Sequence, residues 1–265
     1  MKNTKNLPFN DLREFLDNKC VQYETPAFIE HDPVAIPHYV LATGGRKEDI
    51  EIAAFLSAII AWGQRPVIVK NAFTLLSLMD ERPYEFVMNA GTHEFKTLKS
   101  FVHRTFNSTD LVFFIKSLKQ IYAVHGGMEK VFSDGFAETE TVKGAIIHFR
   151  KLFLQQRHEP RAEKHLSDPE RNSAAKRINL FLRWMLRKGC VDFGLWKGIP
   201  ASALVCPLDV HTGNVSRALG LLTRTQSDWK AVEELAAALR SLDADDPVRY
   251  DYALFGLGMY EGFGR

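Results

Sequence analysis

Apolar residues recur every three or four positions along most of the chain, the spacing that places them on one face of a helix. In residues 9–23 this face holds Phe9, Leu12 and Leu16, and residues 47–62 begin with acidic side chains and continue as a nearly unbroken apolar run. No stretch alternates polar and apolar side chains over the length of a strand. The pattern therefore predicts an all-α fold.

Prolines and glycines divide this helical pattern. Residues 31–38 contain two prolines four positions apart, and each removes a backbone donor and restricts the residue before it. We expect a loop there, or at most one helical turn. A glycine and a proline end the 47–62 helix and place Trp62, Gln64 and Arg65 at a corner between two helices.

The stretch 173–222 combines an amphipathic helix, a turn and a second helix. The apolar face of the first helix consists of Ile178, Phe181, Leu182 and Met185. Its remaining surface is predicted to be cationic and to consist of Lys176, Arg177, Arg183, Arg187 and Lys188. A Pro-Leu dipeptide then brings Asp209 to the start of the second helix, whose inward face is expected to include Val210 and Val215. A lysine and an aspartate thus flank a turn.

Composition and charge narrow the possible partners. The chain has 265 residues, of which 46% are hydrophobic, so it can bury a sizeable core. The net charge of +2 is too small to indicate a nucleic-acid partner by itself, but its distribution is uneven. Residues 150–188 carry eleven Lys and Arg against four Asp and Glu, whereas residues 228–265 carry four against eight. The first of these segments is a candidate phosphate-binding surface.

Cysteine usage and the N-terminal sequence predict the compartment. Cys20, Cys190 and Cys206 are too widely spaced for a metal site and too few for a disulfide framework, so we expect free thiols. The first residues lack the apolar segment of a secretory signal, and no run of 18 apolar residues occurs. We expect a cytosolic protein without a membrane segment.

Three segments resemble the helix–hairpin–helix DNA glycosylases, the superfamily of endonuclease III. The segment PLDVHTGNVSRALGLL resembles the part of that superfamily that carries the catalytic aspartate, and Asp209 matches this residue. LSAIIAWGQRPVIVKNAFTLL is similar to an early helix and turn of the superfamily, and DYALFGLGM resembles its closing helix. The three segments occur in the same order as in the superfamily and cover roughly a third of the chain.

The chain departs from the superfamily pattern at the glycine-rich hairpin. The region before Asp209 reads CVDFGLWKGIPASALVC, which contains no Gly-x-Gly, and the four iron–sulfur cysteines of endonuclease III are missing. The archaeal 8-oxoguanine DNA glycosylase branch also departs at the hairpin, and its catalytic lysine stands farther upstream, at the start of a helix. Lys176, 33 residues before Asp209 (209 − 176), is similarly placed. The features KR-N-FLRWM and PLD-HT are moreover similar to a bacterial family known as domain of unknown function 2400, which implies no activity.

This resemblance implies a catalytic pair. A glycosylase that also cleaves abasic sites needs an amine to attack the sugar C1′ and a carboxylate to stabilise the cationic transition state. Lys176 and Asp209 supply these groups. The alternative is that Lys176 is a solvated lysine of the first helical turn and that Asp209 only caps a helix. Lys188 and Lys197 are weaker candidates for the nucleophile.

The resemblance also implies an overall architecture and a function. We expect a single glycosylase-like unit over residues 1–265, with an all-α, two-lobed fold and a central cleft between a lobe of residues 40–170 and a lobe of residues 1–39 and 171–265. The expected activity is base-excision DNA repair by a DNA glycosylase, a hydrolase with a possible additional lyase step, acting as a monomer on duplex DNA that contains a damaged base or an abasic site. Neither a metal nor a cofactor is expected. The expected DNA-contacting residues are Trp62, Gln64, Arg65, Arg177, Arg183, Arg187, His211, Gly213, Asn214 and Arg217.

Two other functions are compatible with the sequence. The chain could be a DNA- or RNA-binding protein that kept the fold and lost the chemistry, which the missing hairpin favours. It could also be an enzyme that acts on a small nucleoside-like substrate.

Overall fold

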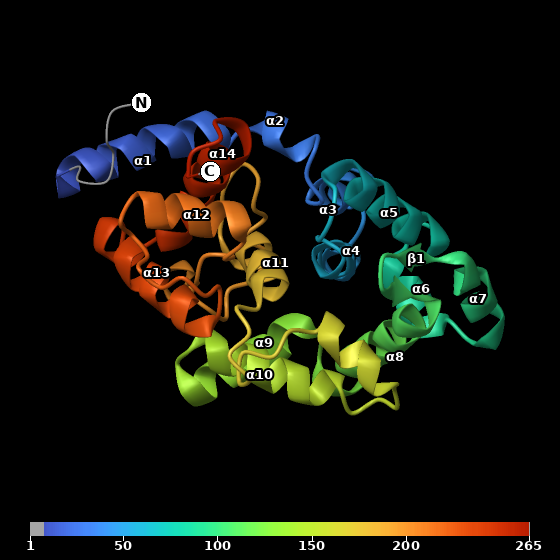
Figure 1. Ribbon diagram of the computed structural model, residues 1–265. Coiled ribbons are helices and arrows are strands. Elements are labelled where there is room, and N and C mark those ends of the chain that lie inside the picture. The colour runs from blue at the N-terminus through green and yellow to red at the C-terminus, as the bar shows by residue number, and fades with distance from the viewer. Residues whose placement is uncertain (1–7, 265) are drawn as a thin grey trace. The chain divides into compact units, whose positions relative to one another are not determined.

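The computed structural model describes residues 8–264 and is built almost entirely of helices, which confirms the all-α prediction (Figure 1). Within this range the only strands are β1 (Val102–His103) and β2 (Phe106–Asn107), which pair antiparallel in a short hairpin. No helix of the described range is long and apolar enough to cross a membrane.

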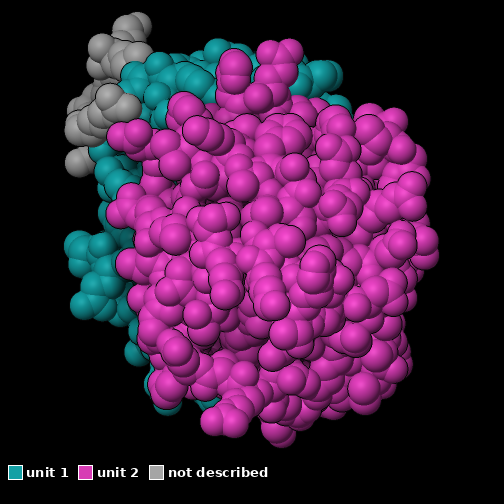
Figure 2. All heavy atoms as spheres, turned by 90° about the vertical axis from the view of Figure 1, so that its right-hand side faces the viewer, with its two compact units in different colours: residues 1–28, 168–265 teal, residues 29–167 magenta. Residues whose placement is uncertain are grey.

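The chain divides into two compact units (Figure 2). Residues 29–167 form one of them, here called the inserted unit. The chain before residue 29 and the chain from residue 168 onward form the other, here called the terminal unit. The boundaries expected from the sequence were residues 40 and 170.

The inserted unit consists of eight α-helices, the hairpin and two short 3₁₀ turns. Its helices are α3 (Ala35–Ala42), α4 (Lys47–Ile59), α5 (Arg65–Leu78), α6 (Pro83–Asn89), α7 (Thr92–Thr97), α8 (Ser108–His125), α9 (Met128–Thr139) and α10 (Val142–Phe153), with α7 being a short six-residue helix. The 3₁₀ turns are η2 (Leu98–Ser100) and η3 (Pro160–His165).

A cluster of phenylalanines forms the core of the inserted unit. Phe55 of the buried helix α4 packs edge-on against Phe149 of α10, with ring centroids 5.6 Å apart. Phe132 of α9 stacks on the same ring at 4.3 Å, so α9 and α10 lie side by side. The close approach of these two helices depends on Gly135, because a side chain there would collide with His148. The nearly unbroken apolar run of α4 is explained by its burial on all sides.

The expectation of a loop, or at most one helical turn, in residues 31–38 holds as far as Val34, but helix α3 begins at Ala35 and continues through Pro37 to Ala42. Pro37 is the third residue of this helix. A proline in the first turn is tolerated because the amide that it lacks has no partner within the helix. The prolines therefore mark the start of a helix instead of excluding one.

The terminal unit brings together helices from the two ends of the chain. Its helices are α1 (Phe9–Tyr23), α11 (Lys176–Leu186), α12 (Val210–Ala218), α13 (Trp229–Leu242) and α14 (Tyr250–Tyr260), with α2 (Pro26–Ile29) at the boundary and the 3₁₀ turns η4 (Ala201–Ala203) and η5 (Pro247–Arg249). Helix α14 packs against both α1 and α12 (Figure 1). The backbone of Gly256 lies against the ring of Tyr23, where a Cβ atom would come within 2.2 Å of a ring carbon.

Candidate active site

Lys176 and Asp209 meet in the terminal unit. Lys176 is the first residue of α11, Asp209 is the N-cap of α12, and Lys176 Nζ lies 3.4 Å from Asp209 Oδ2. The lysine side chain is 37% exposed and the aspartate side chain 12%. The amine is therefore partly exposed to solvent, while the carboxylate is mostly buried.

The two oxygens of Asp209 have separate partners. Oδ1 accepts a hydrogen bond of 2.8 Å from the backbone amide of Thr212, which is an N-cap interaction, and Oδ2 faces Lys176. Capping is therefore compatible with a second role for this residue. The cap also fixes the carboxylate in one orientation, which a catalytic group requires.

A third acid, Asp251 of α14, lies behind this pair and is 5% exposed. Its Oδ1 accepts hydrogen bonds of 3.4 Å from the Thr212 hydroxyl and from the Cys206 thiol, and its Oδ2 pairs with Arg183. Burial raises the pKa of Asp251 to about 6, against the opposing charge of Arg183 and with a further contribution from Asp209. Asp251 therefore ties α14 to the start of α12, where the cap of Asp209 is made.

The prediction that Arg183 and Arg187 face solvent is wrong. They are only 3% and 5% exposed, and both pair with Asp192, at 3.2 Å and 2.9 Å respectively. Arg187 also pairs with Glu24 and Asp246. A buried guanidinium requires such carboxylate partners, and here they come from segments far apart in the sequence. These two arginines stabilise the terminal unit through buried ion pairs. Because they are buried, they are no longer expected to contact DNA.

Arg177 follows Lys176 and is half-buried. Burial lowers the pKa of its guanidinium to about 10. The two weaker candidates for the nucleophile have different surroundings: Lys188 is exposed beyond the end of α11, and Lys197 Nζ donates to the Gly194 carbonyl at 2.9 Å. Among the described residues, no ion pair joins Lys188 to a carboxylate in the way that Lys176 is joined to Asp209.

The first turns of α12 hold most of the other expected contacts. His211 is half-buried and packs edge-on against Phe255, with ring centroids 5.9 Å apart, and Asn214 is half-buried. The Gly213 amide donates to the Asp209 carbonyl at 2.8 Å, so the expectation that it holds a phosphate is wrong. Val210 was expected to face inward and is instead 72% exposed, because the buried face of α12 is formed by Thr212, Gly213, Val215 and Ser216.

Arg217, at the end of α12, stabilises a turn. Its guanidinium donates to the carbonyls of Arg224 and Thr225 at 2.8 Å and 2.9 Å. The residue remains half-buried. These two hydrogen bonds account for an arginine at this position, because they fix the turn that precedes α13.

The remaining expected contacts belong to the inserted unit. Gln64 is exposed at the start of α5, and Arg65 Nη2 pairs with Asp32 Oδ2 at 2.6 Å. Trp62 is half-buried, with the guanidinium of Arg104 5.0 Å from its ring centroid and His103 against its edge. Trp62 is thus engaged in packing on at least two sides.

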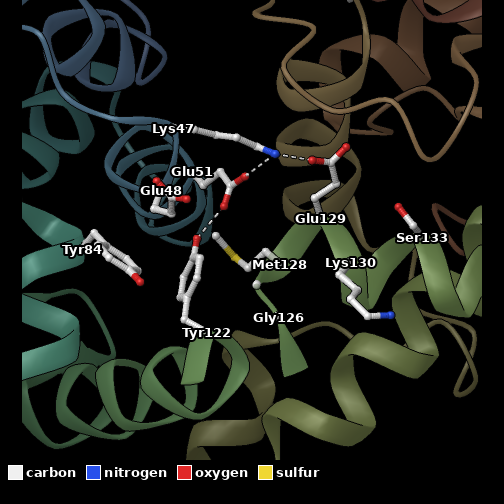
Figure 3. Close-up of a pocket in the computed structure, with 11 residues that line it drawn as sticks. Lys47, Glu48, Glu51, Tyr84, Tyr122, Gly126, Met128, Glu129, Lys130 and Ser133 are labelled. Carbon is white, nitrogen blue, oxygen red and sulfur yellow. Dashed lines mark hydrogen bonds and ion pairs between the residues drawn. The ribbon is translucent and has the colours of Figure 1, made fainter. Parts of the chain in front are cut away.

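The inserted unit contains a pocket of about 390 Å³ that also holds an amine beside carboxylates (Figure 3). Lys47 pairs with Glu129 and lies 3.7 Å from Glu51, which accepts a 2.6 Å hydrogen bond from the Tyr122 hydroxyl. Burial by itself would lower the pKa of Lys47, but the hydrogen bond to Glu129 and the charge of Glu51 outweigh it and raise the pKa. An amine held in its charged form is a poor nucleophile, so this pocket is a weaker candidate for the chemistry.

The sequence interpretation missed Asp251 and its partners Thr212 and Cys206. A signal for Asp251 was present, because an acid within the apolar run of α14 must be buried and must therefore have a partner. The identity of that partner could not be read from the sequence, since Arg183 stands 68 residues earlier.

The chain belongs to the family described as "Protein of unknown function (DUF2400)", whose model matches residues 32–260. No curated protein matches the chain significantly. No solved structure does so either. The matched range includes Lys176, Asp209 and Asp251.

Proposed function

We propose that the protein is a DNA glycosylase that removes a damaged base and also cleaves the abasic site, with Lys176 as the nucleophile and Asp209 as its carboxylate partner. The observation that carries the proposal is the 3.4 Å distance between Lys176 Nζ and Asp209 Oδ2, each at the first turn of its own helix. The resemblance of the Asp209 segment to the helix–hairpin–helix glycosylases supports the same assignment.

The chemistry follows from these two groups. Lys176 Nζ gives its lone pair to C1′ of a nucleotide flipped out of the duplex, and the glycosidic bond breaks with its electrons passing to the departing base. Asp209 stabilises the positive charge that develops on the sugar and accepts the proton that the attacking amine loses. Asp209 then passes this proton to the sugar ring oxygen O4′ as the C1′–O4′ bond breaks, which opens the ring and leaves a protonated imine between Lys176 and C1′. The Asp209 carboxylate, free again, takes a proton from C2′ of this imine, and the C–H electrons form a double bond as the 3′ phosphate leaves with the C3′–O electrons and the strand is nicked.

The test is borohydride trapping on duplex DNA that contains an abasic site or an oxidised base. Borohydride reduces the imine and leaves a stable protein–DNA adduct, which migrates slowly in a denaturing gel. Wild-type protein should form this adduct, and Lys176→Gln should not. Lys188→Gln is the matched control, because it removes the same charge from an exposed lysine just beyond the C-terminal end of the same helix and should form the adduct as wild type does.

The outcomes separate the alternatives. Adduct formation by Lys176→Gln would show that another amine is the nucleophile. Wild-type protein that binds duplex DNA with a strong salt dependence but forms no adduct would be a non-catalytic DNA-binding protein. Absence of both adduct and salt-dependent binding would leave a small nucleoside-like substrate as the better hypothesis.

A further inference from the structure

The backbone just before Lys176 has an unusual conformation. Ala175 has φ 46° and ψ 35°, which lies in the left-handed region, and its side chain is buried at 1% exposure. This conformation is strained for a residue with a Cβ atom, because the Cβ atom comes too close to the following carbonyl oxygen. Glycine would avoid this cost.

Asn179 lies one helical turn into α11 and stabilises the left-handed backbone at Ala175 with two hydrogen bonds. Its side-chain Nδ2 donates to the Ala174 carbonyl at 3.1 Å, and its backbone amide donates to the Ala175 carbonyl at 3.0 Å. Both carbonyls immediately before Lys176 are therefore bound by the same residue. The Asn179 side chain is 1% exposed, so these hydrogen bonds are shielded from water.

The amide of Asn179 is only half satisfied. Within residues 8–264, its Oδ1 is buried and has no hydrogen-bond partner. A buried acceptor in this state is destabilising, because it gives up its hydrogen bonds to water without replacing them. An apolar side chain at this position would avoid that cost, so the amide is not explained by packing alone.

The other end of the segment is fixed to the start of α13. Asn172 Nδ2 donates to Asp228 Oδ2 at 2.9 Å, and the Asn172 carbonyl accepts from the Trp229 amide at 3.1 Å. The Ser173 hydroxyl accepts from the Ala175 amide at 3.3 Å. The chain therefore enters α11 along a path fixed at both ends.

Two local costs thus occur within five residues of one lysine, and their common effect is to fix the direction in which its side chain leaves the helix. Strained or unsatisfied groups of this kind concentrate at functional sites. We infer that Asn179 is a positioning residue, which holds the left-handed turn at Ala175 and thereby directs Lys176 toward Asp209. The catalytic significance of this role rests on the proposed function, whereas the structural role does not.

Three variants test the inference: Asn179→Ala, Ala175→Gly and the double variant. In Asn179→Ala the turn is no longer held, so adduct formation in a single turnover should slow by about tenfold or more, as expected for a misplaced nucleophile. Glycine adopts the left-handed conformation without strain, so Ala175→Gly should restore the double variant to within about threefold of wild type. A loss of packing alone would not be rescued in this way.

A second measurement does not depend on activity. The protein is treated with a limiting amount of an amine-acylating reagent, and the ratio of modified Lys176 to modified Lys188 is measured by mass spectrometry of its peptides. Asn179→Ala should raise this ratio several-fold, because Lys176 is released from Asp209, and the double variant should return it to the wild-type value. If wild-type protein forms no adduct while the ratio changes as expected, the proposed function fails and the positioning role stands.

Two results would overturn the inference. One is an unchanged labelling ratio in folded Asn179→Ala, and the other is a double variant that behaves like Asn179→Ala. If Asn179→Ala does not fold, the single variant Ala175→Gly tests the inference by itself. Relief of strain predicts an equal or higher midpoint of unfolding and an unchanged labelling ratio, and a lower midpoint or a changed ratio contradicts the inference.

Discussion

Replacing Asp209 by asparagine and by alanine separates its two roles. Asparagine caps a helix about as well as aspartate. Asp209→Asn therefore keeps an acceptor for the Thr212 amide, which in the wild-type protein donates to Asp209 Oδ1 at 2.8 Å. It removes the charge that faces Lys176. Asp209→Ala removes both the acceptor and the charge.

The structure gives the size of each effect. Loss of an N-cap to alanine costs about 0.5–2 kcal/mol of stability. Loss of an ion pair whose lysine is 37% exposed costs about 0–1 kcal/mol, because solvent screens it. The free energy of unfolding should therefore fall by about 0–1 kcal/mol in Asp209→Asn and by about 0.5–3 kcal/mol in Asp209→Ala. Both variants should lose activity to a similar extent, on the order of a hundredfold or more, because both lack the carboxylate charge.

Urea unfolding at neutral pH measures the stabilities, and single-turnover base release together with borohydride trapping measures the activity. Asp209→Asn with wild-type activity would refute the catalytic role and leave only a cap. Equal stability losses in the two variants would instead show that the hydrogen bond to Thr212 contributes nothing.

Two further predictions concern the packing and the buried charge of the terminal unit. Gly256→Ala should destabilise the protein by about 1–3 kcal/mol, because the clash with the ring of Tyr23 outweighs the gain of up to about 1 kcal/mol in helix propensity. Thermal unfolding measures this change. An unchanged or higher melting temperature would mean that α1 moves away from the new side chain without loss of stability. The raised pKa of Asp251, about 6, means that this acid contributes stability that is present below its unfolded pKa and is lost as the pH rises through about 6. Relative to Asp251→Asn, wild-type protein should therefore gain about 2 kcal/mol of unfolding free energy between pH 7.5 and pH 4.5, and a parallel pH dependence of the two proteins in urea unfolding would contradict the assignment.

Local features of the fold could be predicted from the sequence because they depend on neighbouring residues. The apolar spacing of residues 9–23 predicts α1 with its bounds, and the position of Asp209 after a proline predicts its cap. In α11, the spacing of Phe181 and Met185 correctly predicts the buried face. Each of these patterns is complete within one or two helical turns.

The fate of the arginines could not be predicted in the same way. Periodicity places Arg183 on the polar side of α11, and a charged residue is normally exposed there. Whether it is exposed depends on the chain opposite, which supplies Asp192 and Asp251. The pairing of Lys176 with Asp209 has the same character, since spacing alone does not bring residues 33 positions apart (209 − 176) together. It was expected only because of the resemblance to a family.

The packing of α1 on α14 also determines when the proposed site can form. During synthesis the inserted unit, residues 29–167, is complete long before α14 exists, and it has its own phenylalanine core on which to fold. Until α14 is made, the ring of Tyr23 in α1 lacks the backbone of Gly256, against which it packs in the folded protein. Asp251 arrives with the same helix. A chain that lacks α14 would therefore expose the ring of Tyr23 and leave Thr212 and Arg183 without their contacts to Asp251.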